Sequence, residues 1–161
     1  MSCLAVAALA LVSHQRGEAE APARAPALSK AEADGIIFER QQIMLQLDKD
    51  AKQLGEIAAG IQPPDKLAEV TRSIANSAKD SKAAFEAEVP GGRSKPEVWS
   101  QWADYSVRMD KFVQNAEQMA KLGQEGNLTA VTGMLADALP CKECHDVYRA
   151  PKKPTTPPPA G

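Results

Sequence analysis

Apolar side chains recur in alternating steps of three and four residues along most of this 161-residue chain, a spacing that places them on one face of an α-helix. Period-two alternation, which predicts β-strands, is missing, and aromatic residues, which strands favour, make up only 4% of the chain. We therefore predict an all-α fold. The pattern is clearest in one stretch: Val98, Trp102, Tyr105, Met109, Phe112, Ala116 and Met119.

Helix breakers divide the pattern into four segments. The first begins at a capping box, Ser29-Lys30-Ala31-Glu32, and ends at Gly60 and Pro63-Pro64. The second runs from about Asp65 to Glu86 and is the weakest, because polar residues interrupt its stripe at Ser77, Ser81 and Lys82. The predicted core face of the first segment is Ile37, Arg40, Met44, Leu47, Ala51, Leu54 and Ala58, and that of the second is Leu67, Val70, Ile74, Ala78 and Phe85.

The third segment follows the breaker Val89-Pro90-Gly91-Gly92 and opens with a second capping box, Ser94-Lys95-Pro96-Glu97. The fourth starts near Asn127 and continues into the cysteines, with a kink expected at Pro140 because proline removes a backbone N–H. Four amphipathic helices with short connections predict an antiparallel up-down-up-down four-helix bundle over residues 29–150.

The two ends of the chain differ from this region. Residues Leu4 to Val12 form an apolar run of signal-peptide length, although no Lys or Arg precedes it. We expect residues 1–28 to be an export signal and linker whose true start lies upstream, and the Pro-rich residues 151–161 to be a disordered tail. A net charge of −2 gives no reason to expect nucleic acid as a partner.

The stretch Cys141-Lys142-Glu143-Cys144-His145 carries the chemistry. A zinc site would need two further ligands, but the remaining histidine and cysteine, His14 and Cys3, lie in the expected export segment. A redox dithiol favours a βαβ setting, which this chain lacks. A pair of idle buried cysteines is a third alternative. The fourth is attachment of a c-type haem, in which the two sulfurs add to the vinyl groups and the histidine reaches the iron; an export signal favours it, because this attachment takes place outside the cytoplasm.

On a helix, positions 141, 144, 145 and 148 share one face, so both thiols, the imidazole of His145 and the ring of Tyr148 are predicted to point into the bundle. Arg40 is unusual because a charged side chain occupies a core position. Either its guanidinium extends to solvent at the end of the bundle or it pairs with a haem propionate. Met44 lies one turn further along the same face.

Residues 33–149 resemble the class II c-type cytochromes, the cytochrome c prime family. The resemblance rests on Arg40-Gln41 with Met44, on Ala84-Phe85, and on Gly91-Gly92 with Lys95-Pro96-Glu97-Val98-Trp99. Its most specific part is the run from Cys141 to Arg149. Arg93 departs from the family pattern, which often has an acidic or polar residue there.

The resemblance implies one haem c near the C-terminal helix, bound covalently through Cys141 and Cys144, with His145 as axial iron ligand. It implies that Arg40 and Gln41 lie beside a haem propionate. It also implies that Met44 faces the distal side of the iron, either as sixth ligand or as a lid over a five-coordinate iron. An arginine at the position of Arg149 lies near the proximal pocket in the family.

We expect a periplasmic haem protein that exchanges single electrons with a redox partner protein. The alternative is a five-coordinate haem that binds nitric oxide or carbon monoxide as a sink or sensor, and a third possibility is a helical interaction protein in which the cysteine motif is coincidental. No acid/base or nucleophile constellation indicates an enzyme. The family also implies a homodimer through the first two helices.

Overall fold

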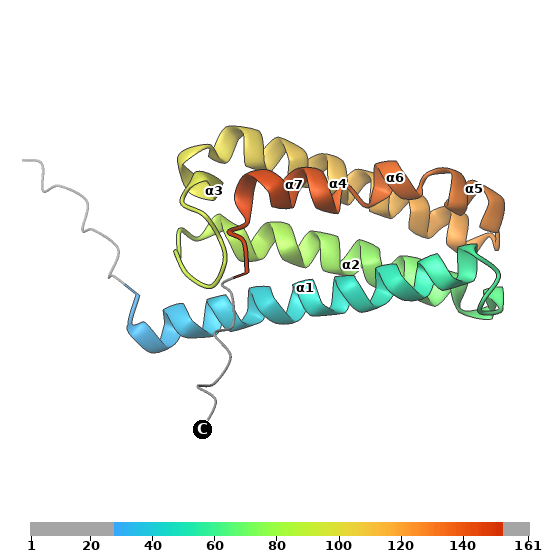
Figure 1. The fold of residues 1–161 in the computed structure, drawn as a ribbon, viewed down its shortest axis with the longest axis horizontal. Coiled ribbons are helices and arrows are strands. Elements are labelled where there is room, and N and C mark those ends of the chain that lie inside the picture. The colour runs from blue at the N-terminus through green and yellow to red at the C-terminus, as the bar shows by residue number, and fades with distance from the viewer. Residues whose placement is uncertain (1–27, 153–161) are drawn as a thin grey trace, which may run out of the picture.

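The computed structural model describes residues 28–152. The expected signal residues 1–27, with Cys3 and His14, and residues 153–161 of the tail lie outside this range. Within it the chain forms helices and one isolated antiparallel bridge, between Ser94 and Arg149, which confirms the all-α prediction (Figure 1). The helices are α1 (Lys30–Ala58), the 3₁₀ turn η1 (Pro64–Lys66), α2 (Leu67–Glu86), α3 (Glu97–Ser100), α4 (Trp102–Gln124), α5 (Leu128–Gly133), α6 (Leu135–Ala138) and α7 (Cys141–Tyr148).

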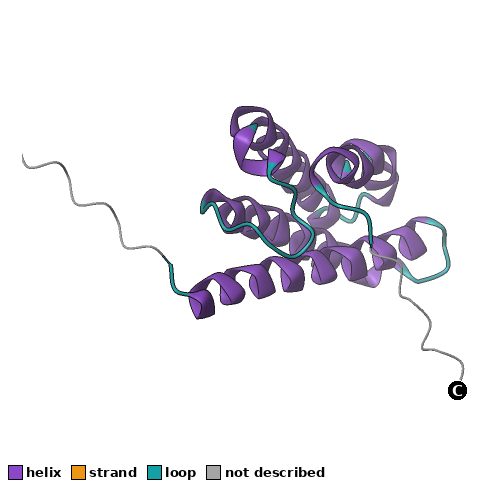
Figure 2. Ribbon diagram, turned by 60° about the vertical axis from the view of Figure 1, so that its left-hand side comes forward, coloured by secondary structure: helices purple, strands orange, loops and turns teal. Residues whose placement is uncertain are grey.

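The helices form a bundle of four antiparallel passes. Helices α1, α2 and α4 run along the molecule, and the short helices α5, α6 and α7 follow one another alongside α4 as the fourth pass (Figures 1 and 2). Helix α2 packs against both α1 and α4. None of the helices within residues 28–152 is both long enough and apolar enough to cross a membrane.

The start of α1 is as predicted. The Ser29 hydroxyl accepts a hydrogen bond from the Glu32 backbone N–H, and the Glu32 carboxylate accepts one from the Ser29 backbone N–H, which completes the capping box. On the predicted core face Arg40 and Leu54 are buried, and the other members are half-buried. The helix also buries Asp50 and Ile57, which the apolar stripe did not include.

The sequence predicted α2 to be the weakest of the helices, with polar interruptions on its core face. Ser77 and Ser81 do not interrupt its core face; both are buried, at 8% and 0% exposure. Their small side chains fit because α2 is covered by helices on two sides. On its α4 side, Gly123 lies so close that a Cβ atom there would be 2.1 Å from the Thr71 hydroxyl oxygen. Small residues therefore allow α2 to pack closely against its neighbouring helices.

The predicted third helix is two helices. Its capping box is wrong: Pro96 is the N-cap of α3, no side chain caps that end, and α3 lasts only four residues before the chain turns at Gln101 into α4. Proline at the cap has no N–H, and the backbone of this segment is used elsewhere, because Lys95 N–H donates to the Tyr148 carbonyl at the end of α7.

The predicted fourth helix is also not continuous. Asn127 caps α5 with its side chain, accepting from the Ala130 N–H, as the position of its start predicted. The helix then breaks at Met134 and again at Leu139-Pro140. Pro140 was expected to kink the helix, and it stands between two separate helices as the N-cap of α7.

Two clusters of side chains fill the bundle. An aliphatic cluster lies between α1, α2, α4, α5 and α6 around Leu54, Ile74 and Met119. The second, which we call the aromatic cluster, is centred on Phe85, Val98, Tyr105, Met109 and Tyr148, with Met44, Trp99, Trp102, Phe112 and Cys144 packed against it. Because Cys144 and Tyr148 belong to α7, the aromatic cluster is the part of the core that faces the cysteine motif.

Candidate functional site

The cysteine motif occupies the first turn and a half of α7. Tyr148 is buried, Cys144 and His145 are half-buried, and Cys141 is exposed. The prediction that all four side chains point into the bundle is therefore wrong for Cys141. This residue opens α7 directly after the break at Pro140, so the start of the motif lies at the surface while the rest turns toward the core.

The two thiols are free and weakly acidic. Neither Cys141 nor Cys144 is in a disulfide, and the pKa of both thiols is raised, because the protein removes part of the water around each sulfur even though Cys141 as a residue is exposed. Reactive dithiol cysteines have lowered pKa values, so this environment does not favour redox dithiol chemistry. Among residues 28–152 no three side chains of the His, Cys, Asp or Glu type gather as a metal site would require. Neutral thiols next to an apolar surface fit addition to a vinyl group.

The walls around Cys144 suit a flat apolar macrocycle. Cys144 of α7 and Met44 of α1 pack against the same aromatic cluster, with Trp99 and Trp102 beside them. A haem needs apolar walls and at least one axial ligand, and these residues come from separate helices that meet at the cluster. The residues present fit a haem attached at α7.

Arg40 is buried, and its guanidinium donates hydrogen bonds to backbone carbonyls at and beyond the C-terminal end of α2. Its side chain is 4% exposed, so it does not extend to solvent. Its Nε donates to the Ala84 carbonyl at 2.7 Å, Nη1 to Val89 at 2.5 Å and Nη2 to Ala87 at 2.8 Å. These carbonyls include ones that a helix end leaves without partners.

Two aromatic rings complete the surroundings of this guanidinium. Its Cζ atom lies 4.6 Å from the centre of the Phe85 ring and 5.2 Å from that of Trp99. The Trp99 indole N–H donates to the Phe85 carbonyl at 3.0 Å and thus supports the same helix end. The arginine was predicted as a core residue; its carbonyl partners were not.

Gln41 lies beside a glycine turn at the same end of the bundle. It is exposed on α1, and its Nε2 is 3.4 Å from the position that a Cβ atom would take at Gly92. Gly92 has a φ of +61°, a conformation that glycine adopts without strain. Gln41 and Arg40 therefore face neighbouring parts of the loop that links α2 to α3.

His145 lies in a positive environment. Its Nδ1 is 3.4 Å from Nη1 of Arg149. The pKa of His145 is lowered, first by burial and then by the charges of Arg149 and Arg93. A neutral imidazole is the form that binds a metal ion, so this environment favours a ligand role.

The end of α7 is held by the loop that precedes α3. Ala150 N–H donates to the Arg93 carbonyl at 2.8 Å, the Arg93 Nε donates to the Ala150 carbonyl at 2.8 Å, and Lys95 Nζ donates to the Val147 carbonyl at 2.8 Å. Arg93 departs from the family pattern in the sequence. In the structure its backbone and side chain both form hydrogen bonds with Ala150, just beyond α7.

Sequence reasoning missed Asp104. This α4 residue is exposed, yet its carboxylate accepts a hydrogen bond from the Tyr148 hydroxyl and a 2.7 Å hydrogen bond from Arg108 Nε. The only local signal was the four-residue spacing of Asp104 and Arg108, which is common on solvated helices. Its contact with α7 depends on the tertiary structure.

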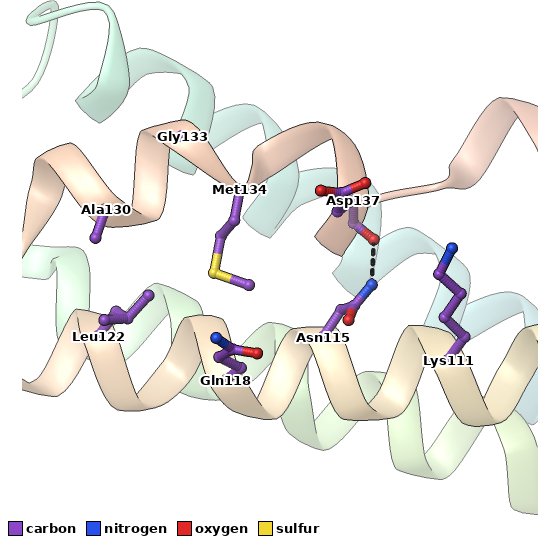
Figure 3. Close-up of a pocket in the computed structure, with 8 residues that line it drawn as sticks. All are labelled: Lys111, Asn115, Gln118, Leu122, Ala130, Gly133, Met134 and Asp137. Atoms are coloured by element: carbon purple, nitrogen blue, oxygen red, sulfur yellow. Dashed lines mark hydrogen bonds between the residues drawn. The ribbon is translucent and has the colours of Figure 1, made fainter.

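An open groove lies away from this site, between α4 and the α5–α6 segment (Figure 3). Polar and apolar side chains share its lining, and Asn115 Nδ2 donates to the Asp137 carbonyl at 2.8 Å across it. None of the predicted site residues lines this groove. The cysteine motif and the aromatic cluster therefore remain the candidate site.

Known proteins resemble this chain over most of the described residues. The family model described as cytochrome c' matches residues 35–149. The cytochrome c' of Alcaligenes xylosoxydans xylosoxydans is 32% identical over 71 residues, which span 44% of this chain and 56% of that relative. The match thus covers little more than half the length of the curated relative.

Solved structures of cytochrome c' from Alcaligenes xylosoxidans share the fold. One, a ferrous variant, has a TM-score of 0.70 at 21% identity and covers 77% of this chain and 100% of its own. A nitric oxide complex of another variant has a TM-score of 0.68 at 23% identity with the same coverage. The ferric protein has a TM-score of 0.69 at 22% identity, covering 74% of this chain and 97% of its own.

The family model spans most of the described residues and includes the whole cysteine motif. Its members are class II c-type cytochromes, and the cofactor is covalently attached haem c. On its sequence and its fold, this chain belongs to the cytochrome c' family.

Proposed function

We propose that this protein transfers single electrons through one haem c attached to Cys141 and Cys144, with His145 as axial ligand of the iron. The observation that carries the proposal is the position of the motif: Cys144 packs on the buried aromatic cluster while Cys141, one turn earlier, is exposed. A macrocycle held by both sulfurs would have one edge in the core and another near the surface. When bound, the haem supplies the ferric–ferrous couple.

His145 and Arg149 set the proximal side. A histidine that binds iron through Nε2 carries its proton on Nδ1, where it becomes a hydrogen-bond donor. Arg149 is also a donor, so in the ligated protein it would not accept this N–H. Its positive charge would stay close to the ring and disfavour an imidazolium. Arg149 thus helps to keep His145 in the neutral state that a ligand requires.

We assign Arg40 and Gln41 to one haem propionate. An arginine has five N–H groups, and three atoms of Arg40 already donate to carbonyls. Its two remaining N–H groups, and the Gln41 amide that lies at the same loop, would donate to a carboxylate of the haem. The carbonyl contacts would hold the guanidinium in place, so it would stabilise the propionate charge without rearrangement.

A second candidate function is binding of a diatomic gas, such as nitric oxide, as a sink or sensor. It is favoured by Met44, which is half-buried on α1 and packs on the same cluster as Cys144. Methionine is flexible, so it serves equally as sixth ligand or as a movable lid over an open iron site. Among the relatives, variants of the Alcaligenes xylosoxidans protein have been solved as nitric oxide complexes.

We place the protein in the periplasm and expect a redox partner protein there, because c-type haem attachment takes place outside the cytoplasm. We also propose a homodimer through the first two helices, α1 and α2, in which α1 contributes an apolar outer face. Phe38 and Leu45 are 61% and 62% exposed and, seven residues apart, share its outer face. Analytical sedimentation of the wild type and of Phe38→Glu tests the proposed dimer. The variant should shift toward monomer. A wild-type protein that is itself monomeric would contradict the proposal.

Absorption spectra in both oxidation states, recorded with a reversible one-electron voltammogram, test the main proposal. We expect a covalent haem spectrum that survives denaturation and a single reversible wave. A protein whose ferrous form instead binds carbon monoxide readily, with no measurable exchange with small redox donors, would support gas binding over electron transfer. Lack of any covalent haem would overturn both.

A further inference from the structure

All the tyrosines and tryptophans of this chain gather at one place. The chain has two of each, Trp99, Trp102, Tyr105 and Tyr148, and all four belong to or pack against the aromatic cluster. Cys144, the proposed attachment point of the haem, packs against the same cluster. The most readily oxidised aromatic side chains of the protein therefore lie next to its proposed redox centre.

The rings are in direct contact. The centres of Tyr105 and Tyr148 are 5.0 Å apart with the rings nearly perpendicular, and those of Trp102 and Tyr105 are 5.6 Å apart. Tyr148 lies on α7, three residues after His145 and four after Cys144. A haem held by Cys144 would therefore be attached one helical turn from the Tyr148 ring.

Tyr148 differs from Tyr105 in having a base for its proton. Its hydroxyl donates a hydrogen bond to Oδ2 of Asp104. The same carboxylate accepts a hydrogen bond from Arg108, whereas the Tyr105 hydroxyl is not among its partners. These two hydrogen bonds lower the pKa of Asp104, which is therefore ionised at neutral pH. The carboxylate side chain is 51% exposed, so a proton received from Tyr148 has a route to solvent.

The hydroxyl itself keeps its proton until it is oxidised. Burial and the hydrogen bond to Asp104 raise the pKa of Tyr148 to about 12. Loss of an electron makes a phenol a strong acid, so its proton must leave at the same time. A base already in hydrogen-bond contact makes that transfer possible without a solvent molecule entering the core.

We propose that Tyr148 is a redox-active tyrosine that passes one electron to an oxidised haem while its proton moves to Asp104. The inference rests on the proposed attachment of haem at α7. The oxidant is hydrogen peroxide: its reduction to two water molecules takes two electrons and two protons. The haem supplies one electron and Tyr148 the other, the O–H bond of Tyr148 breaks, and an O–H bond forms on Oδ2 of Asp104.

The products are two water molecules, a neutral Tyr148 phenoxyl radical, a protonated Asp104 and a haem that has lost one electron, while the two protons consumed by the peroxide come from solvent. A one-electron donor in solution then reduces the radical, and the phenoxyl oxygen takes up a proton from solvent by way of the exposed Asp104 carboxylate. The effect is to remove an oxidising equivalent from the haem before it damages the macrocycle.

Freeze-quench electron paramagnetic resonance of the ferric holoprotein mixed with hydrogen peroxide tests the proposal. Wild type should give a tyrosyl signal, and Tyr148→Phe, which keeps the ring packing, should lose it. Asp104→Asn should form the radical more slowly by on the order of 10²-fold, since the positioned base is gone. Haem bleaching by peroxide should be faster in both variants.

Two variants serve as matched controls. Tyr105→Phe removes the neighbouring phenol, whose hydroxyl is not hydrogen-bonded to the Asp104 carboxylate. Asp110→Asn removes an equal charge from α4 at a residue whose carboxylate pairs with Lys82. Both should keep the wild-type signal and rate. A signal that survives in Tyr148→Phe, or an Asp110→Asn protein as slow as Asp104→Asn, would overturn the proposal.

A photogenerated ruthenium(III) tris-bipyridine oxidant separates this proposal from haem attachment, because it takes the electron from solution and needs no haem. With it, Tyr148 should again be the radical site and Asp104→Asn should again be slow. If haem is missing from the protein while this experiment still succeeds, the proposed function fails and the tyrosine chemistry stands. If haem is attached and Tyr148 is not oxidised by either oxidant, only the tyrosine proposal fails.

Discussion

The Nε atom of Arg40 and the carbonyl oxygen of Ala84, 44 residues apart in the chain, are joined by a 2.7 Å hydrogen bond. Together with the bonds to Ala87 and Val89, it makes one side chain of α1 the cap of the C-terminal end of α2. Helix ends leave carbonyls without intrahelical partners, and here a remote cation satisfies them.

Replacing Arg40 by leucine should therefore destabilise the protein, although the stripe on α1 becomes more apolar. Carbonyls left unpaired in a buried site cost about 1–3 kcal/mol, and we expect a loss of that size in urea unfolding of the holoprotein. Arg40→Lys should recover part of it, since one ammonium cannot reach all three carbonyls. In the same variants, a reduction potential whose pH dependence matches wild type would contradict the assigned propionate contact.

Replacing both Cys141 and Cys144 by alanine should abolish covalent haem retention. The sulfurs form the only covalent bonds that we propose to the macrocycle, so haem should separate from the protein in a denaturing gel stained for haem. The single Cys141→Ala and Cys144→Ala variants should each keep one bond and a stained band. Full staining of the double variant would show that the attachment lies elsewhere.

Replacing Met44 by alanine distinguishes a ligand from a lid. A thioether favours ferrous iron, so if Met44 is the sixth ligand the variant should lose low-spin character, lower its reduction potential and gain affinity for carbon monoxide. If Met44 is a lid, both proteins should be high-spin and only the rate of gas binding should rise. A low-spin variant would require a different sixth ligand. Absorption spectra and stopped-flow mixing measure these quantities.

Replacing Gly123 by alanine should weaken the contact between α2 and α4. A Cβ atom there would be 2.1 Å from the Thr71 hydroxyl oxygen and 3.0 Å from its Cβ, so one of the helices must shift. Overpacking of this kind costs about 1–3 kcal/mol. The double variant Thr71→Ala with Gly123→Ala should regain part of this stability, because the hydroxyl clash is gone. Gly133→Ala, where the added atom meets open space, is the control.

Alkaline pH should unfold the protein through its tyrosines. Burial raises the pKa of Tyr105, and the pKa of Tyr148 is raised to about 12 from an ordinary value of 10.0. Because the folded values exceed the unfolded ones, the stability that these phenols contribute is complete below pH 10 and is lost as the pH rises toward 12 and beyond. Tyrosinate absorbance should therefore appear together with loss of helical circular dichroism. Absorbance that rises near pH 10 in a folded protein would contradict this environment.

Local sequence information was sufficient for the features that depend on neighbouring residues. The capping box at Ser29, the core stripe that includes Arg40 and the break at Pro140 each follow from side chains within one or two helical turns. The Cys141–His145 motif is likewise contiguous, so the hypothesis of haem attachment could be made before any fold was known. A sequence pattern contains this kind of local information.

The tertiary structure decided what depends on segments far apart in the chain. Periodicity showed that Arg40 is a core residue but not that its partners are carbonyls at the end of α2, and it marked Ser77 and Ser81 as interruptions although close packing on two sides buries them. The contact of Asp104 with Tyr148 spans 44 residues and has no local signature. A sequence pattern reports which side chains avoid water, whereas hydrogen-bond partners and packing distances arise only when separate helices meet.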